Sequence, residues 1–160
     1  MKKVILLLPV LFFILCRPCF ATDHSGDELI SLVNLTTEAP TQGKVTSLLG
    51  KPMKIEESKK SVTWYYNHGQ TNMVIKWNKK SAGLEKVYFT NGDVKKSTFD
   101  NSVSGKLKSG VTDILQALKL LGTPKDMTIK EATQEIHYAY QNNVLRLFFR
   151  DRVLVDYTLY

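Results

Sequence analysis

The chain has 160 residues, of which 43% are hydrophobic and 23% charged, so it suits one compact domain or two small fused units and does not favour disorder. Its net charge is +7, and loss of Lys2, Lys3 and Arg17 with the segment described next would lower it to +4. Such a mild charge without a dense basic stripe excludes nucleic acid as the expected partner.

The N-terminal segment predicts export. Lys2-Lys3 precedes an apolar run at 4–15, and Cys19-Phe20-Ala21 offers small residues for a cleavage site. This run is shorter than the roughly 20 residues that a membrane-spanning helix needs. We expect residues 1–21 to be a signal peptide that is cleaved after Ala21, and we expect no transmembrane span in the mature chain.

Both cysteines, Cys16 and Cys19, lie in this segment. Lipid attachment to one of them is an alternative, although Leu15 and Pro18 precede them where lipoprotein processing needs a small residue. Otherwise the mature protein has no disulfide and rests on its hydrophobic core. We expect it in the periplasm, at the periphery of the outer membrane, or outside the cell.

Two short helices are expected after the leader. One spans Asp27–Asn34, and the other begins near Thr41, whose hydroxyl can cap it. The second carries an apolar stripe from Val45 and ends at Gly50, a residue that can adopt positive φ.

Strands follow the second helix, because apolar and polar residues alternate with a period of two. The pairs Glu56-Glu57 and Lys59-Lys60 are interpreted as a solvated charged loop before the first strand. The expected strands are Val62–Asn67, Asn72–Trp77 and Leu84–Phe89, with Val94–Phe99 as an optional fourth after the hairpin signal Asn91-Gly92.

An internal repeat accounts for the rest of the chain. Leu48-Leu49-Gly50-Lys51-Pro52 recurs 72 residues later as Leu120-Leu121-Gly122-Thr123-Pro124. Two further blocks keep this offset: 62–66 onto 134–138, and 73–77 onto 145–149. The second copy then has a helix capped by Thr112 and ending at Gly122, followed by strands at Gln134–Tyr140, Val144–Phe149 and Val153–Leu159.

These elements predict an α+β fold of two tandem helix–helix–antiparallel-sheet repeats, with the helices packed on one face of the sheet. The expected divisions are a first repeat at 22–99, a polar linker at 100–108 and a second repeat at 109–160.

Strand alternation also predicts which side chains share a face. Residues such as Trp64 and Tyr138 are assigned to the face under the helices. The opposite face combines aromatic and charged residues, the usual composition of a protein-binding surface, unless it packs the two copies together. We expect this face to contain Tyr65, Lys76, Tyr88, His137, Arg146, Phe148, Leu154 and Asp156. For Tyr88 the opposite face is an alternative, because the alternation in Leu84–Phe89 fits either orientation.

The helix–Leu-Gly-x-Pro–strand pattern at Thr41–Pro52, with Trp64-Tyr65-Tyr66 and Val87-Tyr88-Phe89 after it, resembles the BamE (SmpA/OmlA) domain of outer-membrane lipoproteins. Two such copies in tandem are similar to the β-lactamase inhibitory protein fold. The resemblance implies helices packed on an antiparallel sheet, and binding of other proteins through the sheet face or loops. It implies no catalytic machinery.

Side chains able to do chemistry are few. Period-two spacing puts Glu135 and His137 on one side of a strand, so a two-ligand metal site or an acid–base pair is conceivable there, but a third ligand is not evident. No nucleophile elbow, phosphate loop or dinucleotide fingerprint occurs. We therefore expect no catalytic residue, no cofactor and no metal.

The sequence favours an exported, non-enzymatic protein-binding domain, in the form of an adaptor or assembly subunit whose partners are other cell-envelope proteins. The alternative is a secreted effector or enzyme inhibitor that binds a foreign protein. The oligomeric state stays open, since the last strand, which reaches Tyr160, could pair with another protein.

Overall fold

A computed structural model describes residues 25–36, 40–68, 70–92, 102, 105–130, 133–140 and 143–160. The expected signal peptide, the optional strand Val94–Phe99 and most of the expected linker lie outside these residues. Cleavage after Ala21 therefore stays a prediction.

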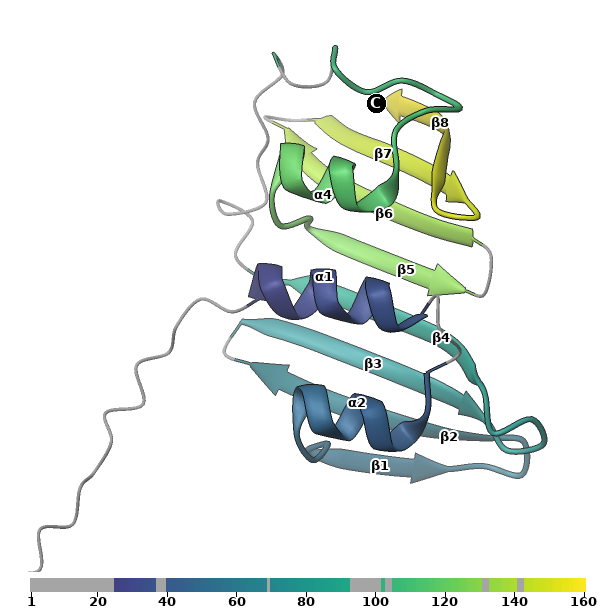
Figure 1. Ribbon diagram of the computed structural model, residues 1–160. Coiled ribbons are helices and arrows are strands. Elements are labelled where there is room, and N and C mark those ends of the chain that lie inside the picture. The colour runs from purple at the N-terminus through teal and green to yellow at the C-terminus, as the bar shows by residue number, and fades with distance from the viewer. Residues whose placement is uncertain are drawn as a thin grey trace, which may run out of the picture.

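One antiparallel sheet of eight strands dominates the fold, and its strands lie side by side in sequence order (Figure 1). Each strand therefore pairs with the one before it and the one after it. The strands are β1 (Lys54–Glu57), β2 (Ser61–His68), β3 (Thr71–Asn78), β4 (Leu84–Asn91), β5 (Asp126–Lys130), β6 (Thr133–Tyr140), β7 (Asn143–Arg150) and β8 (Val153–Leu159).

Three short helices of the described chain, α1 (Ser25–Thr36), α2 (Gln42–Leu49) and α4 (Ile114–Leu121), cover the same face of the sheet (Figure 1). The predicted cap of α2 is confirmed, because the Thr41 hydroxyl accepts a hydrogen bond from the backbone N–H of Lys44 at 3.2 Å.

The predicted cap of α4 is wrong by one residue. Asp113 caps this helix, and its carboxylate accepts from the N–H of Leu115 at 2.8 Å, while the Gln116 side chain accepts from the N–H of Asp113 at 3.0 Å. Thr112 is buried, and its hydroxyl instead accepts from the N–H of Lys108 at 2.8 Å. A carboxylate at this position also suits the positive end of the helix dipole.

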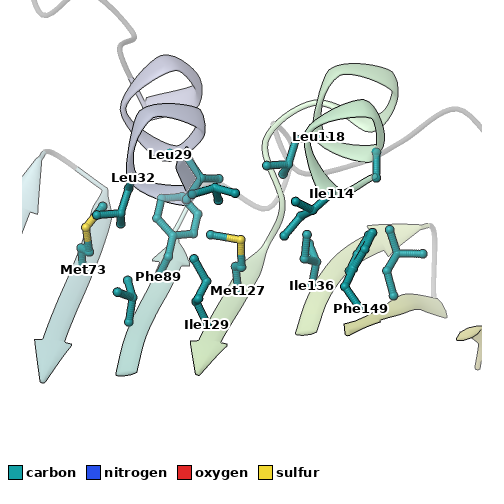
Figure 2. Close-up of a cluster of buried hydrophobic side chains, with 14 of the residues drawn as sticks. Leu29, Leu32, Met73, Phe89, Ile114, Leu118, Met127, Ile129, Ile136 and Phe149 are labelled. Carbon is teal, nitrogen blue, oxygen red and sulfur yellow. The ribbon is translucent and has the colours of Figure 1, made fainter. Parts of the chain in front are cut away.

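A single hydrophobic core lies between the helices and the sheet, and it runs through both halves of the chain. Figure 2 shows Leu29 and Leu32 of α1 above Phe89 of β4, and Ile114 and Leu118 of α4 near Ile136. The residues of α1 that are described in the core are less than 2% exposed, so α1 is held by burial of its apolar face.

The prediction of an α+β chain with two tandem helix–helix–sheet repeats is wrong, because the sheet is continuous and the helices are few and short. The cause is β5, a strand that was not predicted. β5 pairs with β4 through Val87–Ile129 and Phe89–Met127, and it pairs with β6 on its other side. Pairing along both edges of β5 joins what would otherwise be two sheets.

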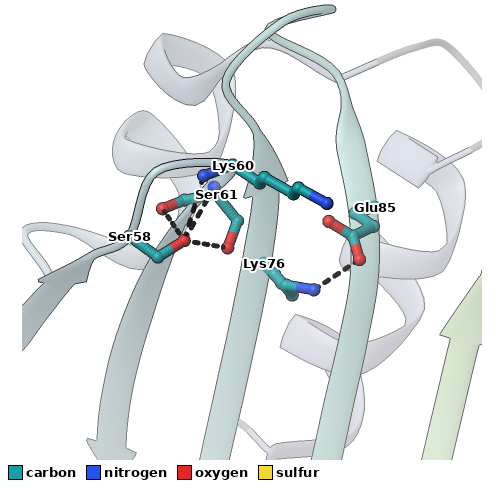
Figure 3. A network of polar contacts seen from close by, with 5 residues as sticks. All are labelled: Ser58, Lys60, Ser61, Lys76 and Glu85. Carbon is teal, nitrogen blue, oxygen red and sulfur yellow. Dashed lines mark hydrogen bonds and ion pairs between the residues drawn. The ribbon is translucent and has the colours of Figure 1, made fainter.

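The charged segment at 54–60 is also a strand and a turn, not the solvated loop that was predicted. β1 pairs with β2 along its whole length, while its side chains remain exposed. Figure 3 shows how the turn between them is closed: the Ser58 hydroxyl oxygen lies 3.0 Å from the backbone N–H of Ser61 and 3.3 Å from that of Lys60. A serine that accepts from nearby backbone amides is a common way to fix such a turn.

Two glycines end α2 and α4 in nearly the same conformation. Gly50 has φ 76° and ψ −164°, and Gly122 has φ 75° and ψ −156°. The positive φ agrees with the prediction, but the extended ψ does not belong to the left-handed helical region. The carbonyls of these glycines accept hydrogen bonds from the hydroxyls of Tyr66 at 3.4 Å and Tyr138 at 3.0 Å, which tie each helix end to the sheet.

Candidate functional site

The sheet face opposite the helices, which we call the open face, carries the candidate site. Figure 1 shows α1, α2 and α4 all on the other face, and no described helix lies on this one. Strand pairing places seven of the eight sequence-predicted residues here: Tyr65, Lys76, Tyr88, His137, Arg146, Phe148 and Asp156.

Leu154, the eighth predicted residue, lies in the core and is 0% exposed, so its assignment to the open face is wrong. The register of β7 and β8 shifts between two pairs, Phe148–Asp156 and Phe149–Leu154, which leaves Val155 without an opposite residue. This bulge interrupts the alternation of side chains. Leu154 therefore faces the helices although Asp156, two residues on, faces away.

The open face is organised in rows that cross the strands. One row, the central row, joins residues of all eight strands because each member pairs with the next one. Its members are Lys54, Tyr65, Val74, Tyr88, Thr128, Glu135, Phe148 and Asp156. Three aromatic residues from distant parts of the sequence thus lie along one line.

One ion pair holds the Tyr65 side chain at the β1 end of the central row. The Tyr65 hydroxyl donates to Glu56 at 2.7 Å, and the Lys54 ammonium lies 2.6 Å from the same carboxylate and 5.5 Å from the centre of the Tyr65 ring. The hydrogen bond from Lys54, and then that from Tyr65, lower the pKa of Glu56. The bond to Glu56 raises the pKa of Tyr65.

The middle of the open face has the same mixture of aromatic and charged groups. Lys86 places its ammonium 5.6 Å from the centre of the Tyr88 ring, a cation–π contact. Lys76 contacts Glu85 at 2.5 Å, and Figure 3 shows this pair on the side of the sheet away from the helices. Tyr88 is 38% exposed, so part of its ring stays available for contact with another molecule.

A second row forms a polar cluster on β5, β6 and β7. The Nδ1 atom of His137 lies 2.5 Å from Asp126, and its Nε2 atom lies 3.1 Å from Glu135. The Glu135 carboxylate also accepts from Arg146 at 2.8 Å. A carboxylate faces each ring nitrogen, so both bonds form together only when each nitrogen carries a proton.

Asp126 is the member of this cluster that the sequence analysis missed, because β5 was not predicted. The signal was present in the alternation of Asp126, Thr128 and Lys130 with the core residues Met127 and Ile129. Asp126 is therefore a third polar group beside Glu135 and His137, which the sequence alone did not reveal. Even so, no set of three His, Cys, Asp or Glu residues within the described ranges could hold a metal ion.

Glu135 predicts a measurable acid dependence of stability. Burial raises the pKa of Glu135, but the hydrogen bond and charge of Arg146, together with His137, outweigh it and bring the pKa below the ordinary 4.5. The folded state then binds fewer protons at this carboxylate than the unfolded state does. The contribution is therefore present above about pH 4.5 and is lost as the pH falls through the folded pKa.

We expect Glu135→Gln to weaken the fall in unfolding free energy between about pH 5 and pH 3, at a cost near neutral pH of about 1 kcal/mol or less, because the pair is partly exposed. Urea unfolding at several pH values measures this. Arg146→Gln is a second test, since it removes the main group that lowers the pKa of Glu135. Parallel pH profiles for Glu135→Gln and the unmodified chain would contradict this account.

Hollows among the described residues include one on the open face and one between helices. One, of about 190 Å³, lies on β7 and β8 and is lined by Arg146, Phe148, Asp156, Tyr157 and Thr158. The other is a wider groove of about 770 Å³ between α1 and α2, and polar residues such as Ser31, Thr41 and Ser47 line it together with Leu48. Only the first is continuous with the central row.

No family model matches the chain, and no curated protein matches it. Within the described residues, no helix is long and apolar enough to cross a membrane.

Several solved structures are similar, and two of them are described here. A candidate β-lactamase inhibitor protein from Streptococcus mutans has 11% identity and a TM-score of 0.49, over 75% of this chain and 82% of that one. A DUF4309 family protein from Bacillus subtilis has 13% identity and a TM-score of 0.28, over 86% of this chain and 97% of that one. The description of the first structure names the same kind of protein as the inhibitor resemblance in the sequence, whereas the BamE resemblance stays a prediction. With both TM-scores below 0.5, neither likeness carries an argument about function, which rests on the open face.

Proposed function

We propose that this chain is an exported, non-enzymatic protein-binding domain that holds its partner on the open face. The observation that carries the proposal is the central row, which aligns Tyr65, Tyr88 and Phe148 across one continuous sheet. Aromatic side chains supply much of the binding free energy at protein interfaces. A ring of charges around them is the usual composition of an interface rim.

The geometry supports binding because the aromatic groups are already ordered. Glu56 fixes the hydroxyl of Tyr65, and Lys86 lies against the ring of Tyr88, so little side-chain freedom is lost when a partner binds. The partner that fits is a protein surface with an apolar ridge for the central row and charged groups beside it. Its charges would meet the ion pairs of Lys54 and Lys76.

Export and an adaptor role in the cell envelope belong to the same proposal. Support comes from the N-terminal apolar run between Lys2-Lys3 and Ala21. The test is to cross-link intact cells that produce the tagged full-length chain, separate envelope from medium, and identify what co-purifies. A stoichiometric envelope protein, with the tagged chain starting at Thr22, is the expected result.

Recovery mainly from the medium, alone or with a foreign enzyme, would overturn the adaptor role. It would favour the secreted inhibitor instead. A chain that keeps residues 1–21 would overturn cleavage.

We expect Tyr65→Ala combined with Phe148→Ala to weaken binding of the co-purified partner by roughly 30-fold or more, because each change removes an aromatic contact at the centre of the proposed interface. Isothermal titration calorimetry with the purified partner measures this loss. Leu120→Ala is the matched control, since Leu120 is an apolar residue of α4 that is 38% exposed on the opposite side. Equal affinity of the double variant and the unmodified chain, with the fold intact, would show that the open face is not the interface.

A further inference from the structure

The two outer strands of the sheet differ in how they are protected against pairing with another strand. β1, at one edge, has three charged residues among its four: Lys54, Glu56 and Glu57. Charges of this kind are a common protection of sheet edges. At the other edge, residues 153–160 have one charged side chain, Asp156, and Val155, Tyr157, Leu159 and Tyr160 are between 44% and 63% exposed.

Among the described residues, the second half of β8 has no backbone hydrogen bond on the side away from β7. The first half of β8 is covered by residues 109–114, because the N–H of Gly110 donates to the carbonyl of Leu154 at 2.7 Å and the N–H of Leu154 donates to that of Thr112 at 2.8 Å. The Ser109 hydroxyl donates to the carbonyl of Val155 at 2.5 Å. Past Val155, strand pairing among the described residues reaches β8 from β7 alone.

The backbone of this open half alternates between β7 and solvent. Tyr160 exchanges two hydrogen bonds with Val144, at 3.1 and 2.7 Å, so its N–H and C=O point towards β7. By the alternation of an antiparallel ladder, Thr158 and Asp156 also point towards β7. The N–H and C=O groups of Tyr157 and Leu159 therefore point outwards.

Their side chains lie on the helix face, where Tyr157 is opposite Leu147 and Leu159 is opposite Leu145. Both partners on β7 are buried, whereas Tyr157 is 44% and Leu159 is 46% exposed. The apolar layer thus continues past the core to the edge of the sheet and ends there half uncovered.

The geometry points to a second copy of this chain as the occupant of this edge, paired antiparallel through residues 156–160. With a two-fold axis at Thr158, Tyr157 lies opposite Leu159 of the second copy, and Leu159 lies opposite Tyr157 of the second copy. Each of these two pairs exchanges two backbone hydrogen bonds through its outward groups, which gives four in all. The same register places Tyr157 and Leu159 against their counterparts on one face. Asp156 lies opposite Tyr160 of the second copy, so the only charged side chain of the segment does not meet its equivalent.

This pairing extends the sheet to twice its width and puts both open faces on the same side. Because five paired residues bury less than the roughly 1,200 Å² of a standard interface, we expect a weak dimer with a Kd on the order of 10–100 μM. The inference does not depend on the proposed binding role of the open face, since the two use different residues.

Cysteine cross-linking tests the register. In a chain whose Cys16 and Cys19 are replaced by Ser, Thr158→Cys places two thiols on the axis, where directly opposite residues without mutual hydrogen bonds have Cα atoms about 4.5 Å apart, within disulfide range. Asp156→Cys is the matched control, because a four-residue offset separates its Cα atoms by about 13 Å. We expect mild oxidation to give a covalent dimer of the first variant only.

Sedimentation velocity over a range of concentrations provides the second measurement. Leu159→Pro should abolish the dimer and leave the fold intact, because the lost N–H points outwards and proline is tolerated at such edge positions. Ile55→Lys is the control at the β1 edge, where the Ile55 side chain is 52% exposed, and it should leave the dimer unchanged. A monomer at all concentrations, or equal cross-linking of both cysteine variants, would overturn the inference.

Discussion

Phe89→Ala is expected to lower the free energy of unfolding by about 3–5 kcal/mol, the usual cost of emptying a fully buried aromatic site. Phe89 is 0% exposed and pairs with Met73 on one side and Met127 on the other, at the junction of the two halves of the sheet. Figure 2 shows Leu29 and Leu32 of α1 over its ring. The cavity would therefore loosen the helix and both halves together. Urea denaturation followed by circular dichroism and by tryptophan fluorescence measures the loss.

Tyr88→Ala is the matched control, because Tyr88 is the neighbouring aromatic residue on the open face and is 38% exposed. Its cost should stay below about 1 kcal/mol. Both probes should report one transition, since β4 and β5 are hydrogen-bonded neighbours in a continuous core. Two separate transitions, or equal costs for the two variants, would contradict the single-sheet architecture.

Gly122→Ala is expected to cost roughly 1–3 kcal/mol although the added methyl group meets no atom within 4 Å. The whole cost comes from the backbone, because φ 75° with ψ −156° is a region that only glycine occupies readily. Thermal unfolding monitored by calorimetry measures the change. Gly50→Ala should behave alike, since its dihedral angles are nearly the same.

Gly43→Ala is a control that should change the stability in the opposite direction. Gly43 lies in α2 at ordinary helical φ, and the nearest atom to its added methyl group is the Thr41 hydroxyl at 3.9 Å. Alanine in a helix should raise stability by about 0.4–1 kcal/mol, chiefly by restricting the unfolded chain. Equal effects at Gly43 and Gly122 would show that the end of α4 is not strained by a side chain.

Local patterns predicted most elements of the chain. The period of two in β2, β3, β6 and β7 is strong, because each strand buries one face and leaves the other half exposed. It placed Trp64 and Tyr138 inside and Tyr65 and Arg146 outside, as the structure has them. The Leu-Gly-x-Pro signals marked the ends of α2 and α4 for the same reason, since they depend only on nearby backbone geometry.

The short strands were harder to predict. β1 has only four residues, and every one of them is exposed, so no alternation of apolar and polar side chains reveals it. β5 has the right alternation at Met127 and Ile129, but five residues after a Gly and a Pro resemble a loop. Such strands form because their neighbours offer unpaired backbone groups, which is a property of the assembled sheet.

By itself, the sequence determined which residues prefer the core, where the helices end and which side chains are aromatic or charged. These features depend on local geometry and on the cost of exposing apolar surface. The tertiary structure alone decided that β4 and β5 join the two halves, that Asp126 meets His137, and that the bulge at Val155 turns Leu154 inwards. All three depend on the register between strands, because a shift of one residue exchanges the two faces and no local pattern specifies the partner.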